Sequence, residues 1–186
     1  MAIETPKHTL VKKENGFEIR QYDSMIIATT SVRSDYSDAA STGFRRIASY
    51  IFGGNSASMS IEMTAPVLTN TPDPEDIYEI QFIMPSEHSM EDLPQPNSQN
   101  VTLKKVNLGR TAVLRFGGWA TKDRASHYQN ELSDLLAASG YTVNGTFMVA
   151  QYNSPWAIPP FRKNEIIVQI RYCLLYTSPS PRDYGT

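Results

Sequence analysis

The stretch Phe17–Val32, FEIRQYDSMIIATTSV, decides how the chain folds. Its first six residues alternate apolar and polar side chains, as the residues of a half-buried β-strand do. Asp23-Ser24 has the composition of a turn, and Met25–Val32 is an apolar run with the length of a second, more buried strand. The stretch therefore predicts two consecutive strands, and Ser34-Asp35 directly after it offers side chains that can cap a helix.

The helix expected after this cap covers Asp38–Phe52. Its apolar residues recur at intervals of three and four, which places them on one face of a helix: Ala40, Phe44, Ile47, Ala48 and Ile51. Gly53-Gly54 then ends the helix, because glycine readily adopts the left-handed conformation that closes a helix C-terminus.

The second half of the chain repeats this order of elements. After a loop over 85–100, strands are predicted over Val101–Asn107 and Thr111–Phe116, and Thr121 is placed to cap a second helix that Gly140 ends. Two strands are expected after each helix, over Ser60–Leu68, Ile77–Met84, Thr146–Tyr152 and Glu165–Arg171. Each half is thus strand-strand-helix-strand-strand, a pattern that favours an antiparallel sheet or barrel with two helices packed outside it.

Composition excludes several classes of function. The 186 residues hold 17 Lys and Arg against 19 Asp and Glu, so no basic surface for DNA or RNA is expected. The single cysteine, Cys173, excludes an internal disulfide framework and a cysteine-rich zinc site. No apolar run reaches the ~20 residues that span a bilayer, and the first residues lack the apolar core of a signal peptide. We therefore expect a cytoplasmic protein with no membrane span.

The final stretch, residues 173–186, differs from the rest of the chain. It contains Ser-Pro-Ser-Pro-Arg-Asp and shows neither helical nor strand periodicity. We expect one folded domain over residues 1–172, followed by a disordered tail that is a cloning or read-through remnant.

Six short strings carry a resemblance to a known family. In chain order they are Glu4-Thr-Pro-Lys, Phe17-Glu-Ile-Arg-Gln-Tyr, Thr42-Gly-Phe-Arg-Arg-Ile-Ala-Ser-Tyr-Ile, Met63-Thr-Ala-Pro-Val, Phe116-Gly-Gly-Trp, and Tyr152-Asn-Ser-Pro followed by Arg162-Lys-Asn-Glu. Together they resemble the SOUL family of haem-binding proteins over about residues 4–172, and the fourth and last strings form the specific pair. The resemblance implies an α+β fold, a distorted eight-stranded antiparallel β-barrel with two flanking helices and an internal pseudo-twofold. That fold agrees with the element order predicted above.

The resemblance also implies non-covalent, reversible binding of haem or a related tetrapyrrole, with the protein acting as a carrier or buffer. In the family the ligand lies in a shallow apolar cleft beside the first helix, whose positions here are Phe44, Ile47, Ala48 and Ile51. The second wall is carried over to the segment 152–163, with three residues for stacking on the ring: Trp156, Ile158 and Phe161. Arg162 and Lys163 are the cations for the propionates. These residue types suit a flat apolar plate with two carboxylates at its edge.

Gln21 departs from the family pattern. Some members carry a histidine directly before the tyrosine of the first strand, where it can ligate iron, and an amide is a poor iron ligand beside an imidazole. Three alternatives stay open. Haem binds without a strong protein ligand, or Met59, Met63 or His127 supplies one, or the natural ligand is a metal-free or magnesium tetrapyrrole.

Two other classes of function compete with tetrapyrrole binding. A cofactor-independent enzyme could act on a small apolar or pigment-like molecule in the same cleft, with Glu62 or Glu165 as its acid or base. An interaction module could instead present a helix or loop to another protein, whose identity the sequence leaves unspecified. Without a catalytic motif of known spacing, the sequence favours binding over catalysis.

Overall fold

The structure is a computed structural model that describes residues 3–70, 76–153 and 161–172. Its regular elements follow in chain order: β1 His8–Lys13, β2 Glu18–Arg33, α1 Tyr36–Ile51, β3 Val67–Asn70, β4 Ile77–Ile83, β5 Thr102–Gly117, α2 Lys122–Ala138, β6 Tyr141–Val143, β7 Met148–Gln151 and β8 Lys163–Tyr172. The fold is α+β, as predicted, and both predicted helix caps are confirmed. The Asp35 side chain accepts the N–H of Asp38, and the Thr121 side chain accepts the N–H of Arg124.

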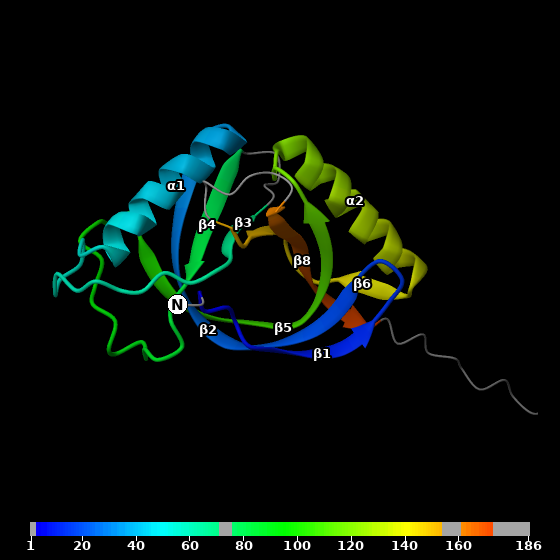
Figure 1. Ribbon diagram of the computed structural model, residues 1–186, viewed down its shortest axis with the longest axis horizontal. Helices are drawn as coiled ribbons and strands as arrows, with labels where there is room; N and C mark the ends of the chain where they lie inside the picture. Colours follow the sequence, from blue (N-terminus) through cyan, green and yellow to red (C-terminus); the bar gives the residue numbers. More distant parts are fainter. Residues whose placement is uncertain (1–2, 71–75, 154–160, 173–186) are drawn as a thin grey trace, which may run out of the picture.

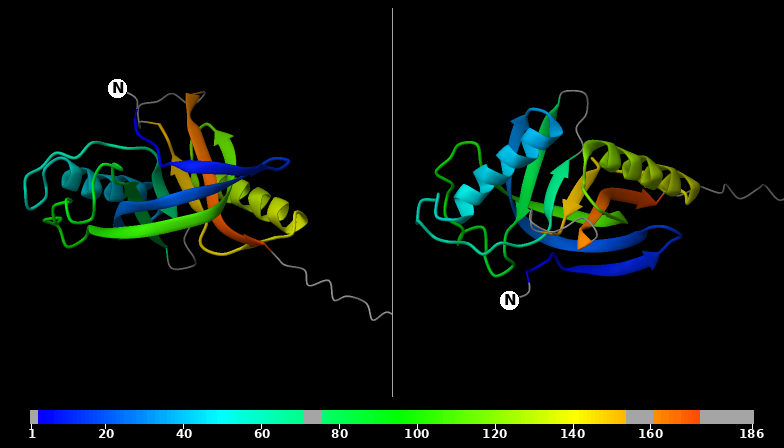
Figure 2. Two further views of the ribbon diagram at one scale, coloured as in Figure 1. Left: turned by 90° about the horizontal axis from the view of Figure 1, so that it is seen from below. Right: turned by 45° about the horizontal axis from the view of Figure 1, so that its top comes forward.

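Six antiparallel strands close a barrel (Figure 1). Their order is β2-β4-β3-β7-β8-β5, and β5 pairs back with β2 to complete the ring. The two further strands lie outside this ring, since β1 pairs with β2 and β6 pairs with β8. The two helices cover the outside of the barrel on either side, with their N-terminal ends turned toward each other (Figures 1 and 2).

The barrel has the predicted internal pseudo-twofold. In the first half, β2 pairs with β4 and β4 with β3; in the second half, β5 pairs with β8 and β8 with β7. The halves meet through β2–β5 on one side and β3–β7 on the other. The helices α1 and α2 occupy equivalent places after β2 and β5, whereas β1 and β6 are the parts that break the repeat.

The predicted break at Asp23-Ser24 is wrong, because β2 runs through it as one strand. The equivalent predicted break between residues 107 and 111 is also wrong, because β5 is continuous there. The physical reason is the long ladder between the two strands, which pairs Glu18 with Val113 at one end and Thr29 with Thr102 at the other. Backbone hydrogen bonds to a distant strand thus override a local turn signal.

A change of face does occur near the predicted turn. Tyr22 and Ile27 both belong to the apolar cluster inside the barrel, although residues five apart on a regular strand point to opposite faces. The residues of β2 that face the lumen are therefore even-numbered at its start and odd-numbered further along. Asp23 and Ser24, where this change occurs, are exposed. The polar pair marks a shift in alternation and not the end of a strand.

Three apolar clusters hold the fold together. The first fills the lumen and takes one or two residues from each of the six barrel strands: Tyr22, Ile27, Leu68, Ile83, Val113, Met148, Ala150 and Ile167. The second packs α1 on β2 and β4, and the third packs α2 on β5 and β8. Gly43 lets α1 approach the sheet closely, since a Cβ there would lie 2.6 Å from the Ile80 side chain.

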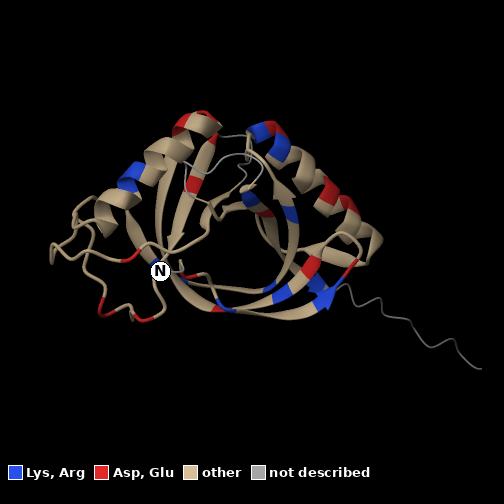
Figure 3. Cartoon of the chain, in the orientation of Figure 1, with Lys and Arg blue, Asp and Glu red and all other residues tan. Residues whose placement is uncertain are grey.

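No helix in the described part of the chain is both long and apolar enough to cross a membrane. Lys and Arg residues (blue) and Asp and Glu residues (red) both occur on each helix and on the strands (Figure 3).

Candidate functional site

The apolar stripe of α1 is divided between core and surface. Ile47 and Ile51 are fully buried in the cluster that joins α1 to the sheet. Phe44 and Ala48 are half-buried, and the Phe44 ring lies edge-on to the Phe82 ring with 5.3 Å between centroids. Of the four predicted cleft positions on α1, Phe44 and Ala48 are therefore those that offer surface to a ligand.

The second predicted wall is described only in part. Trp156 and Ile158 lie outside the described residues. Phe161 is exposed, whereas Arg162 is only 7% exposed because the Trp119 ring covers it. The Arg162 guanidinium carbon lies 3.8 Å from the centre of that ring, a cation–π contact.

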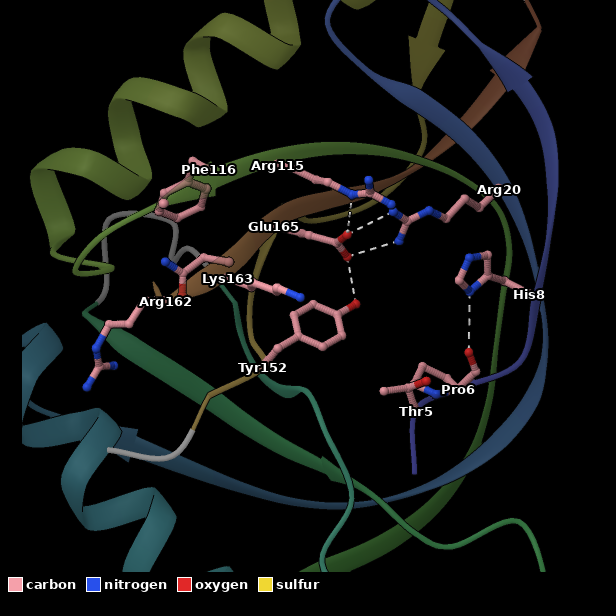
Figure 4. A pocket seen from close by; sticks show the side chains of 12 residues that line it. Thr5, Pro6, His8, Arg20, Arg115, Phe116, Tyr152, Arg162, Lys163 and Glu165 are labelled. Atoms are coloured by element: carbon pink, nitrogen blue, oxygen red, sulfur yellow. Dashed lines mark hydrogen bonds and ion pairs between the residues drawn. The ribbon is translucent and has the colours of Figure 1, made fainter. Parts of the chain in front are cut away.

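Arg162 and Lys163 point to opposite sides of the barrel wall (Figure 4). Lys163 shares its face of β8 with Glu165 and Ile167, and Ile167 belongs to the lumen cluster. Arg162 shares its face with Asn164 and Ile166, on the outer side that carries the helices. The two cations that the resemblance assigned to one ligand edge thus lie on opposite faces of the chain here, although both line one pocket.

A buried ion-pair network lies inside the barrel, around Glu165 near the start of β8. Glu165 accepts two hydrogen bonds from the Arg20 guanidinium, from Nη2 to Oε1 at 2.8 Å and from Nη1 to Oε2 at 3.0 Å. The Tyr152 hydroxyl donates to Glu165 Oε2 at 2.6 Å, and Arg115 Nε donates to Oε1 at 3.3 Å. Glu18 balances the second arginine charge, because it accepts from both Arg20 and Arg115.

This network holds Glu165 in its ionised form. Burial acts to raise the pKa of Glu165, but the hydrogen bonds from Arg20 and Tyr152 and the charge of Arg20 outweigh burial and lower the pKa below its usual range. Burial and the adjacent Glu165 charge raise the pKa of the Tyr152 hydroxyl. Glu165, a candidate acid or base of the enzyme alternative, is thus engaged by hydrogen bonds from Arg20, Arg115 and Tyr152. Glu62, the other carboxylate considered for that role, is exposed.

A pocket of about 600 Å³ opens above this network, at the mouth of the lumen (Figure 4). Its walls come from the segment that precedes and begins β1, from β2, β5 and the start of β8, and from Tyr152 directly after β7. Arg20, Tyr152 and Glu165 line it on one side, and Pro6 and Phe116 on others. The pocket therefore combines an apolar wall with a polar, ion-paired one.

Comparison with known proteins agrees with this architecture. The sequence profile described as SOUL heme-binding protein matches residues 3–169. This chain belongs to the SOUL heme-binding protein family. Among curated proteins, Heme-binding protein 2 of Homo sapiens is 30% identical over 165 residues, 83% of this chain and 80% of that protein. The Mus musculus protein of the same name is 30% identical over 158 residues, 81% of this chain and 76% of that protein.

Solved structures share the fold of this SOUL family member at low sequence identity. A structure titled as a hydrolase from Listeria innocua has a TM-score of 0.60 at 12% identity and covers 87% of this chain and 94% of its own. The EcmrR C-terminal domain has a TM-score of 0.64 at 12% identity and covers 84% of this chain and 97% of its own. At these identities the similarity establishes the fold alone.

The position of Gln21 is separate from the α1 stripe of this SOUL family member. Gln21 is exposed on β2, where its register partners are Thr9 of β1 and Arg110 of β5. Its side-chain amide lies 3.5 Å from the Tyr22 carbonyl oxygen. Residues of β2 that pack under α1, such as Ala28, lie at the other end of the strand.

The three alternative iron ligands occupy different surroundings. Met59 packs against the α1 cluster, and Met63 is partly exposed in the segment before β3. His127 is exposed on α2, where its ring lies 5.0 Å from the Tyr128 ring. Among the described residues, no group of three or more His, Cys, Asp or Glu side chains is placed to hold a metal ion.

Two features of the site were missed by the sequence interpretation. Trp119 was quoted only as part of a family string, yet it covers Arg162 with a half-exposed ring. The hydrogen bonds that Arg124 and Asn164 donate to the carbonyls of Gly117 and Gly118 fix the turn that carries it. Arg20, a polar residue of the alternating stretch Phe17–Tyr22, is buried and hydrogen-bonded in the lumen.

Proposed function

We propose that this protein reversibly binds haem or a related tetrapyrrole and acts as its carrier or buffer. The observation that carries the proposal is its membership of the SOUL heme-binding protein family over nearly the whole described fold, residues 3–169. The two curated relatives named Heme-binding protein 2 support the same class of ligand.

The proposed site lies beside α1, on the outer face of the barrel. Phe44 and Ala48 supply apolar contact to one face of the ring, while Ile47 and Ile51 fix the helix against the sheet beneath them. Binding of a porphyrin is favoured by about 25 cal/mol for each Å² of apolar surface removed from water, less the cost of immobilising the ligand. A shallow site of this composition suits reversible capture better than permanent retention.

Aromatic and cationic groups complete the proposed site. Phe161 and Trp119 expose aromatic surface at the start of β8 and before α2, and Arg162 lies beneath Trp119 on the helix-bearing side. Arg162 is thus the cation placed to receive a propionate on that side, and it would do so at the edge of the Trp119 ring. The predicted contributions of Trp156 and Ile158 remain part of this proposal.

Titration of the purified protein with ferric haem, followed by visible absorption, tests the proposal. A Soret shift that saturates near one equivalent is expected. Transfer of the bound haem to an excess of apomyoglobin is the test of the carrier role, because a reversible site must release its ligand. Absence of a saturable shift would contradict tetrapyrrole binding, and retention of haem against apomyoglobin would contradict the carrier role alone.

A further inference from the structure

The pocket at the lumen mouth is distinct from the apolar stripe of α1, since among the described residues none of α1 lines it. Its lining includes Lys163 and Glu165, on the inner face of β8, together with Arg162 on the outer side (Figure 4). At about 600 Å³ it has the size of a small-molecule site. Of its lining, the proposed function uses Arg162 alone.

Glu165, the carboxylate in the pocket lining, has no remaining capacity for a ligand. Each of its two oxygens accepts two hydrogen bonds from the surrounding protein, with donors from Arg20, Arg115 and Tyr152. A carboxylate has about four acceptor positions, so these four donors occupy them all. A cationic ligand that entered the pocket would meet no available anion.

The charge that remains in the pocket is positive. Arg20 and Arg115 are balanced by Glu18 and Glu165. Lys163 is exposed and lines the same pocket, and within the described residues no ion pair is formed by its ammonium group. Lys163 therefore adds to the lining a positive charge that no described carboxylate balances.

Arg115 adds a second point of contact for an anion. Its side chain is 67% exposed, and its ion pairs with Glu165 and Glu18 use Nε and Nη2. Among described residues, no hydrogen bond from Nη1 is observed, so this nitrogen can donate to a ligand. Charge-assisted hydrogen bonds from an ammonium and a guanidinium are well suited to a carboxylate.

We propose that this pocket binds a small amphipathic carboxylate, a second ligand distinct from the tetrapyrrole. The ligand carboxylate lies between Lys163 Nζ and Arg115 Nη1, and its apolar body lies against Pro6 and the Tyr152 ring. The Arg20–Glu165 pair forms the floor and sets the preference for anions, because it consumes the negative charge that would otherwise attract a cation.

A pair of probes with the same apolar body and opposite charge tests this proposal. Titrations of ¹⁵N-labelled protein with 3-phenylpropionate and with 3-phenylpropylammonium are followed by amide chemical shifts. We expect saturable shifts with 3-phenylpropionate at residues around the pocket, at His8, Phe116 and Lys163 among them, and none there with the ammonium probe. Equal shifts with both probes, or shifts with the ammonium probe alone, would overturn the proposed selectivity.

Variants of Lys163 separate its charge from general packing. Lys163→Gln should weaken 3-phenylpropionate binding by about three- to fivefold, as expected for an exposed ion pair, and Lys163→Arg should restore most of it. The control Lys122→Gln removes a similar exposed charge at the start of α2 and should leave the affinity unchanged. Unchanged 3-phenylpropionate binding by folded Lys163→Gln would refute the site. Loss of the 3-phenylpropionate-induced shifts when protoporphyrin IX is bound would also refute it, because the two ligands would then share one site.

Discussion

Arg20 of β2 and Glu165 of β8 form a bidentate ion pair inside the barrel, with nitrogen–oxygen distances of 2.8 and 3.0 Å, although they lie 145 residues apart in the sequence. Their strands are not neighbours, since β5 lies between them and pairs with both. Arg115 of β5 bridges the gap, because it contacts Glu165 and Glu18. One side-chain network thus links three adjacent strands from both halves of the pseudo-twofold.

Glu165→Gln should destabilise the fold by about 3 kcal/mol at neutral pH. Removing one partner of a buried ion pair costs about 3–5 kcal/mol, because the other charge is left buried and uncompensated. We expect the lower end of that range because Glu18 still pairs with Arg20. Urea unfolding measures the loss, with Glu62→Gln as an exposed-carboxylate control that should change stability by less than about 0.5 kcal/mol. A loss as small as that of the control would show that the pair contributes nothing net.

The same carboxylate predicts a pH dependence of stability. The pKa of Glu165 is lower in the folded protein than in the unfolded chain, so the folded state binds fewer protons. Its contribution is therefore fully present above the unfolded glutamate value of about 4.3 and is lost as the pH falls below that value through the folded pKa. Melting temperatures from pH 7 down to pH 3 should decline less steeply for Glu165→Gln than for the wild type. Parallel curves would contradict this origin of acid sensitivity.

Gly43→Ala should destabilise the protein despite the better helix propensity of alanine. Alanine gains about 1 kcal/mol over glycine inside a helix, whereas overpacking a core contact costs about 1–3 kcal/mol. The added Cβ would lie 2.6–2.8 Å from three atoms of Ile80, including its own Cβ, so rotation of the Ile80 side chain cannot relieve the contact. We expect the melting temperature to fall by about 2–4 °C. Ser41→Ala, at an exposed position of α1, should not lower it, and a Gly43→Ala protein as stable as wild type would show that α1 moves freely away from β4.

Local signals predicted the helices well and the strand breaks poorly. The caps at Asp35 and Thr121 and the stripe that buries Ile47 and Ile51 depend on neighbours within a few turns, so the sequence pattern is sufficient. The Asp23-Ser24 turn failed because the ladder to β5 depends on residues more than eighty positions away. β1 was missed because all of its residues are exposed, so burial imposes no alternation on them.

The site could be predicted only where a family string carried it. The ligand role of the α1 stripe and of the cations at the start of β8 came from the resemblance, but the opposite orientation of Arg162 and Lys163 depends on where β8 begins. The burial of Arg20 could not be predicted, because its partner Glu165 reaches it only when the barrel closes. In an alternating strand, apolar periodicity predicts that a charged residue faces solvent, but Arg20 faces the lumen.

Gln21→His should leave the spectrum of bound haem unchanged. The side chain lies on the outward face of β2, between β1 and β5, whereas the proposed ligand lies beside α1. A histidine there would have no access to iron held at α1, so neither variant nor wild type should show a strong histidine-ligated low-spin spectrum. Visible absorption of the ferric complex measures this. A new low-spin spectrum in the variant would place the ligand over β2, and a wild-type low-spin spectrum abolished by His127→Ala would place it on α2.

Ala48→Asp should weaken haem binding at least tenfold, about 1.4 kcal/mol, because it places a carboxylate against the apolar face of the ring. Ala48 is half-buried on α1, so folding of the variant is first confirmed by circular dichroism and melting temperature. Ser49→Asp is the matched control, since it adds the same charge at the neighbouring exposed position and should change the affinity less than twofold.

Comparing the loss of haem affinity in Arg162→Ala with that in Ala48→Asp decides where the ligand lies. The loss in Arg162→Ala should be only a few-fold and should shrink at higher salt, because Arg162 is 7% exposed beneath Trp119 and a propionate can reach it only at its solvent-facing edge, where the contact is screened; the apolar contact at Ala48 is not screened. Haem titrations at low and high salt measure both effects. A folded Ala48→Asp that binds haem like wild type, together with a large loss in Arg162→Ala, would move the ligand away from α1 and toward the Trp119 turn.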